Sequence, residues 1–379
     1  MATLTLPSFG TPSAKSSNPP DDSTRTNFPL TVFIGRFQPF HLGHLFVLRM
    51  ALALGRHVLV LTGSAFGARG LKNFLLTSEV EALIRSCLPA EENARLHIRG
   101  IPDMYNDTAW IVEVHRAVHE QASILGLDLS DESDICLVGH SKDESSRYLT
   151  LFPRWSSREA DNFQGFHAST FREAWLRDAD TALAQHGDML PPTVRDRMAE
   201  FSRSPEYAWL HEEMRDRDER WAANGGRAPF IYTCDGVVTC AGYVLLVERA
   251  KSPSRGLLSL PGGYLKDGET SRDTLTGNLV FEHGLLTSPS RSKADALEML
   301  DHYVTADQVF DHPTRSDRGR TVSRTFLLEL PPGELPPTRK GPLGTPDWYP
   351  LARLDSLRER MVDDHAHIIS DMTPRSGDR

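Results

Sequence analysis

The sequence predicts an α/β protein, with a doubly wound parallel sheet in the first half of the chain and a separate α+β domain in the second half. Between about residues 30 and 185, apolar strands alternate with segments of helical periodicity, which is the order of a parallel sheet covered by helices on both faces. From Ile231 onward the pattern changes to short strands around a centre rich in Gly and Pro. The length of 379 residues also exceeds what one hydrophobic core usually supports, so two domains are expected.

The predicted elements follow this division in order. In the first half, strands are expected at residues 31–35, 58–62, 96–101 and 134–138, and helices at 45–52, 78–88, 107–123 and 170–185. In the second half, strands are expected at 231–239, 243–249 and 321–330. We therefore expect a disordered segment 1–28, a first domain 29–185, a polar helical connector 186–228 and a second domain 229–372.

The composition is that of an ordinary globular protein, with 39% hydrophobic and 25% charged residues. A net charge of −9 argues against a general nucleic-acid-binding protein, which would carry an excess of basic residues. No run of 18 apolar residues and no hydrophobic signal segment is present, so neither a membrane partner nor secretion is expected. Four cysteines without paired spacing indicate buried thiols in a reducing, cytoplasmic compartment: Cys87, Cys136, Cys234 and Cys240. The oligomeric state is left open, a homo-oligomer included.

The most informative motif is His41-Leu42-Gly43-His44, which follows the first predicted strand. The strand runs into the turn Gly35-Arg36-Phe37-Gln38-Pro39-Phe40, and a helical segment comes next, so both histidines lie at or just before a helix N-terminus. Such an end offers unpaired N–H groups and positive dipole charge, which favour an anion. Gly43 leaves room for a phosphate near the backbone, and histidines three residues apart share a face. The flanking strand and helix favour a phosphate-transfer site over a chance tetrapeptide.

At this point the chain resembles the nucleotidylyltransferase superfamily, whose (H/T)xGH signature follows the first strand of a Rossmann-like sheet. The longer string from Gly35 to His44 is similar to the nicotinamide-nucleotide adenylyltransferase branch. The resemblance implies transfer of AMP from ATP to nicotinamide mononucleotide (NMN), giving NAD and pyrophosphate. It also implies which residues are catalytic: His41, His44, Arg36, Lys142 and Arg172.

Two further segments extend the resemblance to the ATP site. Gly139-His140-Ser141-Lys142-Asp143 follows the fourth strand directly, at the end of the sheet where open α/β folds bind ligands. An exposed loop lysine is the alternative interpretation of Lys142. Phe166–Arg172 resembles the family's ISxTxxR element, with Ser169 where Thr is usual, and an N-cap role for Ser169 is compatible with it. The implied ATP-binding residues are Gly35, Phe37, Gly43, Gly139, Ser169 and Thr170.

The nicotinamide end of NMN is expected at a third segment. In the resembling family an acidic residue and a Trp at this spacing bind it, which implies Asp103, Asn106 and Trp110 here. An indole face against a cationic pyridinium is a sound recognition device, although a core Trp on an amphipathic helix is the alternative. Gly63-Ser64-Ala65 with Lys72-Asn73-Phe74 is similar to the family's GSA…(K/R)NPF(T/S)xxER segment, without its proline and with Val80 in place of its arginine.

The implied reaction is a direct displacement that requires no covalent protein intermediate. Catalysis then depends on positioning and on neutralising phosphate charge. Mg²⁺, with Mn²⁺ as the alternative ion, would bridge phosphate oxygens without a dedicated protein cage.

The second half contains a segment that resembles a degenerate Nudix box, G-x5-E-x7-R-E-U-x-E-E-x-G-U. Four positions match, at Gly263, Glu269, Glu282 and Gly284. The arginine and two glutamates of the pattern are replaced by Gly277, Asn278 and Phe281. Because Nudix carboxylates at i, i+3 and i+4 hold the divalent cations that activate water, Glu282 alone would be a weak metal ligand. We therefore expect an α+β Nudix fold with impaired pyrophosphate hydrolysis.

Two other stretches, Asp311–Thr321 and Asp363–Ile369, are similar to Nudix domains fused to this adenylyltransferase. The resemblance to the bifunctional adenylyltransferase–Nudix family thus covers about residues 30–370. Two alternatives remain for the second domain. It hydrolyses ADP-ribose with metal ligands from outside the box, which makes the chain fully bifunctional, or it binds ADP-ribose or NAD without cleavage as a sensor.

Overall fold

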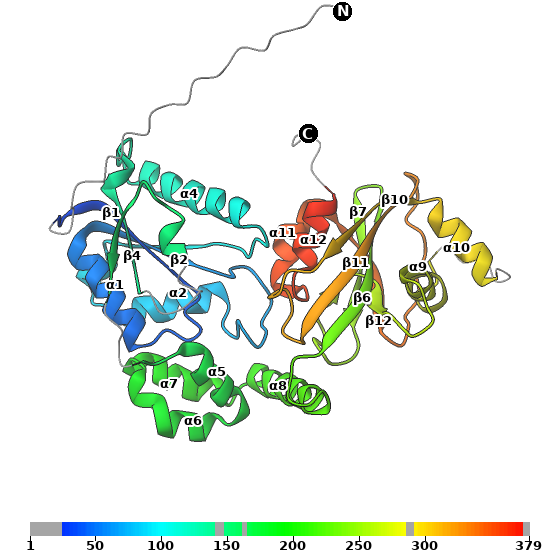
Figure 1. The fold of residues 1–379 in the computed structure, drawn as a ribbon, viewed down its shortest axis with the longest axis horizontal. Helices are drawn as coiled ribbons and strands as arrows, with labels where there is room; N and C mark the ends of the chain where they lie inside the picture. Colours follow the sequence, from blue (N-terminus) through cyan, green and yellow to red (C-terminus); the bar gives the residue numbers. More distant parts are fainter. Residues whose placement is uncertain (1–24, 141–147, 161–164, 286–291, 374–379) are drawn as a thin grey trace, which may run out of the picture.

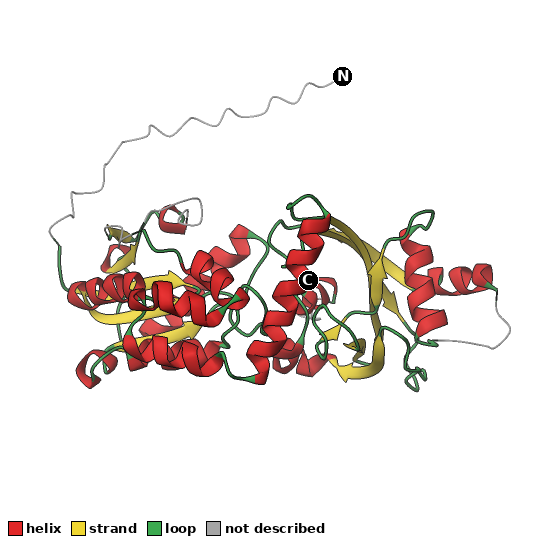
Figure 2. Ribbon diagram, turned by 90° about the horizontal axis from the view of Figure 1, so that it is seen from below, coloured by secondary structure: helices red, strands yellow, loops and turns green. Residues whose placement is uncertain are grey.

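The computed structural model describes residues 25–140, 148–160, 165–285 and 292–373. Two sheets lie beside each other along the long axis of the molecule, and each has helices on both faces (Figures 1 and 2). Residues 1–24 of the segment expected to be disordered lie outside the described residues.

The first sheet is parallel and has the strand order β3-β2-β1-β4-β5. Its strands are β1 Phe28–Gly35, β2 Gly55–Thr62, β3 Leu96–Gly100, β4 Ile135–Gly139 and β5 Ser156–Glu159. The four predicted strands and their parallel arrangement are confirmed. The edge strand β5 was not predicted, because its four residues are all polar. The strand order reverses at β1, and ligands of open α/β sheets bind beyond the carboxyl ends of the strands at such a point.

Eight helices accompany this sheet in the described residues. They are α1 Leu42–Leu54, α2 Thr77–Ser86, α3 Ala90–Asn93, α4 Asp107–Ile124, α5 Ala168–Arg177, α6 Ala179–His186, α7 Pro192–Phe201 and α8 Pro205–Ala223. The single helix expected over 170–185 is in fact two helices. Asp178 ends α5 and caps α6, because its carboxylate accepts a hydrogen bond from the Thr181 amide at 3.0 Å.

Alternate strand residues build two hydrophobic cores, one on each face of the first sheet. Val58 and Val60 of β2 face the core under α1, α2 and α5–α8, whereas Leu59 and Leu61 face the core under α4. The polar segment expected as a connector also contributes to the first of these cores. From it, Val194, Met198, Phe201, Leu210 and Met214 are buried there.

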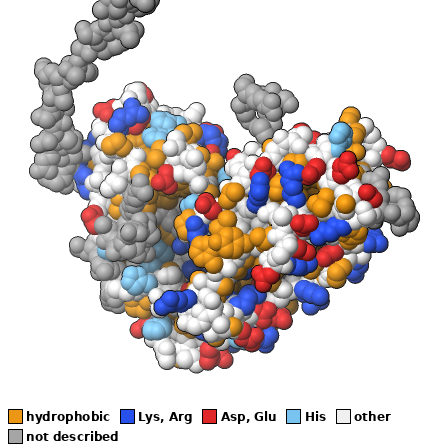
Figure 3. Space-filling model, turned by 45° about the vertical axis from the view of Figure 1, so that its right-hand side comes forward, with side chains coloured by type: hydrophobic (Ala, Val, Ile, Leu, Met, Phe, Trp, Pro, Cys, Tyr) orange, Lys and Arg blue, Asp and Glu red, His pale blue; other side chains and the backbone are white. Residues whose placement is uncertain are grey.

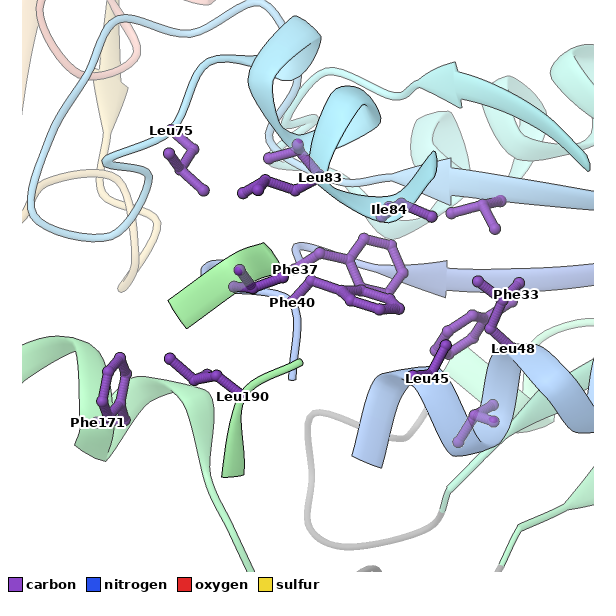
Figure 4. Close-up of a cluster of buried hydrophobic side chains, with 14 of the residues drawn as sticks. Phe33, Phe37, Phe40, Leu45, Leu48, Leu75, Leu83, Ile84, Phe171 and Leu190 are labelled. Atoms are coloured by element: carbon purple, nitrogen blue, oxygen red, sulfur yellow. The ribbon is translucent and has the colours of Figure 1, made fainter. Parts of the chain in front are cut away.

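The turn after β1 is anchored in the core under α1. Figure 4 shows Phe37 and Phe40 between Leu45 of α1 and Leu83 of α2, and both rings are 1% exposed. The buried side chains of Phe37 and Phe40 therefore fix the backbone between Gly35 and His41 to the core. This anchoring positions the histidine motif.

The second sheet is mixed and has the order β10-β11-β6-β7-β12, with β8 paired to β7 and β9 paired to β6. Its strands are β6 Phe230–Cys240, β7 Tyr243–Arg249, β8 Leu258–Ser259, β9 Gly262–Tyr264, β10 Val304–Phe310, β11 Arg320–Glu329 and β12 Gly344–Pro350. The three predicted strands are confirmed. The two edge strands were not predicted, because β10 exposes most of its side chains and β12 contains two prolines.

The helices of this sheet are α9 Ser271–Thr276, α10 Lys293–Asp301, α11 Leu354–Leu357 and α12 His365–Met372. Helices α9 and α10 cover the outer face, whereas α11 and α12 cover the face turned toward the first domain (Figure 1). The α/β class with a second mixed-sheet domain is thus confirmed.

The surface and the thiols agree with the composition. Lys and Arg side chains are interspersed with Asp and Glu on the face that Figure 3 presents. Cys136, Cys234 and Cys240 are buried free thiols, as expected, and Cys87 is half-buried. Within the described ranges, no helix combines the length and the apolar character needed to cross a bilayer.

Candidate active site

The two histidines of the motif lie at the N-terminus of α1, as predicted. His41 is the N-cap residue, and His44 is in the first turn with its ring centroid 3.7 Å from that of His41. Both imidazoles therefore face the same side. One detail differs from the expectation of free amides: the Gly43 N–H donates a hydrogen bond of 3.1 Å to His41 Nδ1. This bond orients the His41 ring and uses one N–H group of the helix terminus.

The turn before the histidines has little freedom. A Cβ on Gly35 would lie 2.8 Å from the Phe37 ring, so only glycine fits at that position. Phe37 itself has a φ of 54° and a buried side chain. The Phe37 side chain is thus part of the core and not of a ligand-binding surface.

Arg172 is the most constrained charged group of the site. Its guanidinium is 6% exposed and donates from Nε to the Leu71 carbonyl at 2.9 Å and from Nη1 to the Gln38 carbonyl at 3.0 Å. Burial and, secondly, the positive charge of Arg36 lower the pKa of Arg172 to about 10. The group still carries its charge at neutral pH, and its Nη2 has no partner among the described residues. Two guanidiniums this close favour a ligand with several negative charges.

The remaining predicted ATP-site residues lie on neighbouring elements. Ser169 and Thr170 are exposed in the first turn of α5. Gly139 ends β4, where a Cβ would lie 2.6 Å from Leu149 and 2.8 Å from the Tyr148 hydroxyl. Lys142 lies outside the described residues, so the structure does not place it.

Two contacts connect α5 and the residues just before it with the N-terminus of α1 and with the turn after β1. The His41 ring lies 5.0 Å from the Phe166 ring, which comes just before α5. Arg172 of α5 bonds to Gln38 of the turn. The carboxyl ends of the central strands and two helix N-termini thus meet, and they bring together imidazoles, guanidiniums and hydroxyls. This is a set of donors suited to a polyphosphate.

The loop between β2 and α2 is held from three sides. The Gln38 side chain makes two hydrogen bonds with the backbone of Leu75, at 2.8 and 3.0 Å. Arg172 bonds to Leu71, as described above. From the second domain, Asp317 accepts the Lys72 amide at 3.1 Å and the Lys72 ammonium at 2.9 Å. A residue of the second domain therefore positions a loop that contacts the site in the first.

Of the three residues predicted to bind the nicotinamide end, Asp103 lines a pocket between the domains, and Asn106 and Trp110 are not among the residues that line it. Asp103 accepts a hydrogen bond of 2.8 Å from the Ser64 hydroxyl and lines a pocket between the domains. Asn106 caps α4 through the Ala109 amide at 3.0 Å. Trp110 is half-buried against the core under α4, with its ring 6.0 Å from Phe152, and it is absent from the pocket lining. One side of the Trp110 ring thus packs against the core, which supports the interpretation of Trp110 as a core residue for that side.

The pocket between the domains was not anticipated from the sequence. The Tyr105 ring lies in it, 5.2 Å from His312 and 5.2 Å from His367 of the second domain. Burial, together with the negative charges of Asp364 and Asp103, raises the pKa of Tyr105 well above its usual value. Asp364 is in turn paired with Arg315 through two hydrogen bonds of 2.8 Å in the buried wall. The sequence features that could have indicated this pocket are the stretches Asp311–Thr321 and Asp363–Ile369, which resemble fused Nudix domains. Both border this interface.

The degenerate box lies around α9 and continues in a π-helix over Gly277–Glu282. Asn278 is 6% exposed and lies against Gly263, where a Cβ would be 3.1 Å from Asn278 Nδ2. Phe281 is 42% exposed. Because a π-helix has i→i+5 hydrogen bonds, the α-helical i, i+3, i+4 alignment expected for metal-binding carboxylates does not apply here. Glu269 accepts a hydrogen bond of 2.9 Å from the Thr274 hydroxyl.

Sequence comparison assigns each half of the chain to a family description. A cytidylyltransferase-like profile matches residues 32–92, and a NUDIX domain profile matches residues 232–372. The nicotinamide/nicotinic acid mononucleotide adenylyltransferase of Acinetobacter baylyi is 40% identical over 149 residues, which are 39% of this chain and 76% of that protein. An ADP-ribose pyrophosphatase of Methanocaldococcus jannaschii is 29% identical over 101 residues, which are 27% of this chain and 52% of that protein.

Two of the similar solved structures match nearly the whole chain. One is described as a bifunctional NMN adenylyltransferase/ADP ribose pyrophosphatase from Francisella tularensis, complexed with AMP and a Mn ion. The match has a TM-score of 0.76 and 26% sequence identity, and it covers 91% of this chain and 98% of that one.

The forked donors of Arg172 provide a direct test of the polyphosphate interpretation. Arg172→Lys keeps the charge but has all its donors on one nitrogen, which cannot occupy the separate positions of Nε, Nη1 and Nη2, so we expect about 10-fold or more weaker binding of inorganic tripolyphosphate. Isothermal titration calorimetry on the full chain measures this. Arg177→Lys on the exposed side of the same helix is the matched control, and equal affinity of both variants would contradict the assignment.

Proposed function

Because the chain belongs to the nicotinamide/nicotinic acid mononucleotide adenylyltransferases and carries a NUDIX domain, we propose that it transfers AMP from ATP to NMN. The products are NAD and pyrophosphate. The observation that carries this proposal is the arrangement of His41 and His44 at the N-terminus of α1, beside Arg36 and the buried Arg172. These groups lie at the carboxyl end of the central strand, where a nucleotide binds in open parallel sheets.

The reaction is a substitution at the α-phosphorus of ATP. An oxygen of the NMN phosphate forms the new bond, the bond to the bridging oxygen of the β-phosphate breaks, and pyrophosphate leaves with that electron pair. His44 and His41 donate to the phosphate oxygens on which charge develops. Arg36, Arg172 and Lys142 hold the β- and γ-phosphates, with Ser169 and Thr170 at the terminus of α5. Donors that are fixed before the reaction stabilise the developing charge without a cost of reorganisation, and the hydrogen bonds of Arg172 to Leu71 and Gln38 fix that guanidinium in this way.

The donor set also bears on the metal. The residues assigned to the phosphates are imidazoles, guanidiniums and hydroxyls rather than carboxylates, and therefore suit an anion more than a bare cation. A divalent ion fits here as a companion of ATP, and we propose Mg²⁺, with Mn²⁺ as the alternative. When bound, it supplies charge neutralisation between phosphate oxygens.

We propose that the second domain retains the NUDIX fold but hydrolyses the pyrophosphate bond of its ligand poorly. Its support is the replacement of two box glutamates by the buried Asn278 and the exposed Phe281, which leaves Glu282 as the one carboxylate in the π-helix. Hard cations prefer several charged oxygens, so a weak metal site at Glu282 activates water poorly. The domain then binds ADP-ribose or a related nucleotide more readily than it cleaves it.

One observation favours the alternative of a fully bifunctional enzyme. The Francisella tularensis protein, which matches nearly the whole chain, is named as both an NMN adenylyltransferase and an ADP ribose pyrophosphatase. If this chain shares the second activity, its metal ligands come from outside the matched box positions.

Adenylyl transfer depends on His44 under this proposal. His44→Ala removes one transition-state donor, so we expect a loss of about 10²-fold or more in kcat. Chromatography of NAD and pyrophosphate after incubation with NMN, ATP and Mg²⁺ measures it. His186→Ala, at an exposed position of α6, is the control and keeps normal turnover. Near-normal NAD synthesis by His44→Ala would remove the histidine from the mechanism.

Trp110 addresses the pyridinium ring of NMN rather than ATP. Trp110→Ala is therefore expected to raise the KM for NMN and to leave the KM for ATP nearly unchanged, whereas Trp110→Phe keeps most of the stacking. Steady-state kinetics with each substrate varied in turn separates the two effects. Equal weakening of both substrates with a lowered melting temperature would identify Trp110 as a core residue only.

The NUDIX proposal predicts little or no AMP from ADP-ribose with Mg²⁺ or Mn²⁺, measured by chromatography on the full chain. Restoring Gly277→Arg, Asn278→Glu and Phe281→Glu together returns the arginine and the two metal-binding carboxylates of the box and should raise the rate. Ordinary turnover by the wild type, about 1–10³ s⁻¹, that Glu282→Gln leaves unchanged would contradict impairment. The fully bifunctional alternative would then hold.

A further inference from the structure

Three side chains with metal-binding atoms meet on the first domain, on elements other than those that carry the phosphate-binding groups. His115 and His119 are on α4, and Glu132 is in the 3-10 turn that precedes β4. One potential ligand atom from each lies within 4.8 Å of the other two. The i, i+4 spacing places both imidazoles on one face of the helix. Within the described ranges, no other trio of His, Cys, Asp or Glu meets this distance limit.

The ligand atoms of this trio are available. In the described part of the chain, neither imidazole has a hydrogen-bond partner. The His115 ring lies next to two aromatic rings, with centroid distances of 5.0 Å to Trp155 and 5.3 Å to Phe152. Glu132 Oε1 pairs with Arg154 at 2.7 Å, but the Arg154 side chain is 76% exposed. Glu132 Oε2 is buried and has no hydrogen-bond partner. A buried carboxylate oxygen without a partner is costly, and a cation would satisfy it.

We propose that His115, His119 and Glu132 bind one divalent transition-metal ion, with Zn²⁺ as the best match. Two imidazoles and one carboxylate are ligands that Zn²⁺ accepts, and three protein ligands leave a fourth position for water. Mg²⁺ and Ca²⁺ do not fit, because they prefer oxygen ligands throughout. The ion would join α4, whose first turn carries Trp110, to the turn that leads into β4. It would thereby stabilise this side of the first domain.

The full chain, freed of metal with a chelator, is titrated with Co²⁺, whose visible absorption reports nitrogen and oxygen ligands, and then with Zn²⁺ in competition. The test variants are His119→Ala, at an exposed position, and Glu132→Gln. The matched control is His97→Ala, because His97 and His57 form a second histidine pair at 3.3 Å without a carboxylate. His44→Ala controls for binding at the histidine pair of α1. Thermal melting without metal establishes that each variant is folded.

We expect one equivalent of Co²⁺, displaced by Zn²⁺, and a higher melting temperature of the wild type with Zn²⁺. His119→Ala and Glu132→Gln should bind about 100-fold or more weakly, since even outer-shell changes cost 10- to 100-fold. Both control variants should bind as the wild type does. The proposal would be overturned if the wild type bound no metal or if His119→Ala kept the wild-type affinity. It would also be overturned if a control variant, rather than a test variant, lost binding.

Discussion

The Arg172 guanidinium donates hydrogen bonds to Gln38 and Leu71 from a position that is almost closed to solvent. Through these bonds, α5 is fixed to the turn after β1 and to the loop before α2. Each bond from a buried charged group is worth about 1.5–3 kcal/mol, and loss of the arginine would leave two carbonyls unpaired. The relative positions of α5, this turn and this loop therefore depend on this one side chain. The phosphate-binding role that we propose for Arg172 and Arg36 uses elements that these hydrogen bonds already fix.

The same loop extends this constraint to the second domain. Lys72 is held by Asp317, and Leu71, the preceding residue, accepts a hydrogen bond from Arg172. Tyr105, close to the residues assigned to NMN, lies between His312 and His367 across the interface. The NUDIX domain thus contacts both the loop before α2 and the segment before α4. With Asn278 and Phe281 at two glutamate positions of its box, it still positions the loop to which Arg172 bonds.

Sequence patterns predicted the elements in which apolar residues recur at the regular spacing of a strand or a helix. The buried strands around β1, the helix after His41 and the three central strands of the second sheet all have strong apolar periodicity. The edge strands were not predicted from the sequence, because β5 is polar, β10 is exposed and β12 contains prolines. The break at Asp178 was also missed, since a cap inside an amphipathic segment does not disturb its period. The histidine motif was placed correctly because a strand, a turn and a helix fix its position together.

Contacts between distant segments could not be read from the sequence. Nothing in the local pattern around Asp317 indicates that it caps a loop 245 residues earlier. Resemblance to fused NUDIX domains marked the two interface stretches, but only the structure shows what they touch. The spacing of the box residues likewise assumed an α-helix, and the π-helix over Gly277–Glu282 departs from it.

The central claim is that this chain moves the adenylyl group of ATP onto NMN. The most direct measurement uses ATP labelled at the α-phosphate in one reaction and at the γ-phosphate in another, each with NMN and Mg²⁺. The α-label is expected in NAD and the γ-label in pyrophosphate, in equal amounts. Label that stays in ATP, or α-label released as AMP without formation of a dinucleotide, would contradict it.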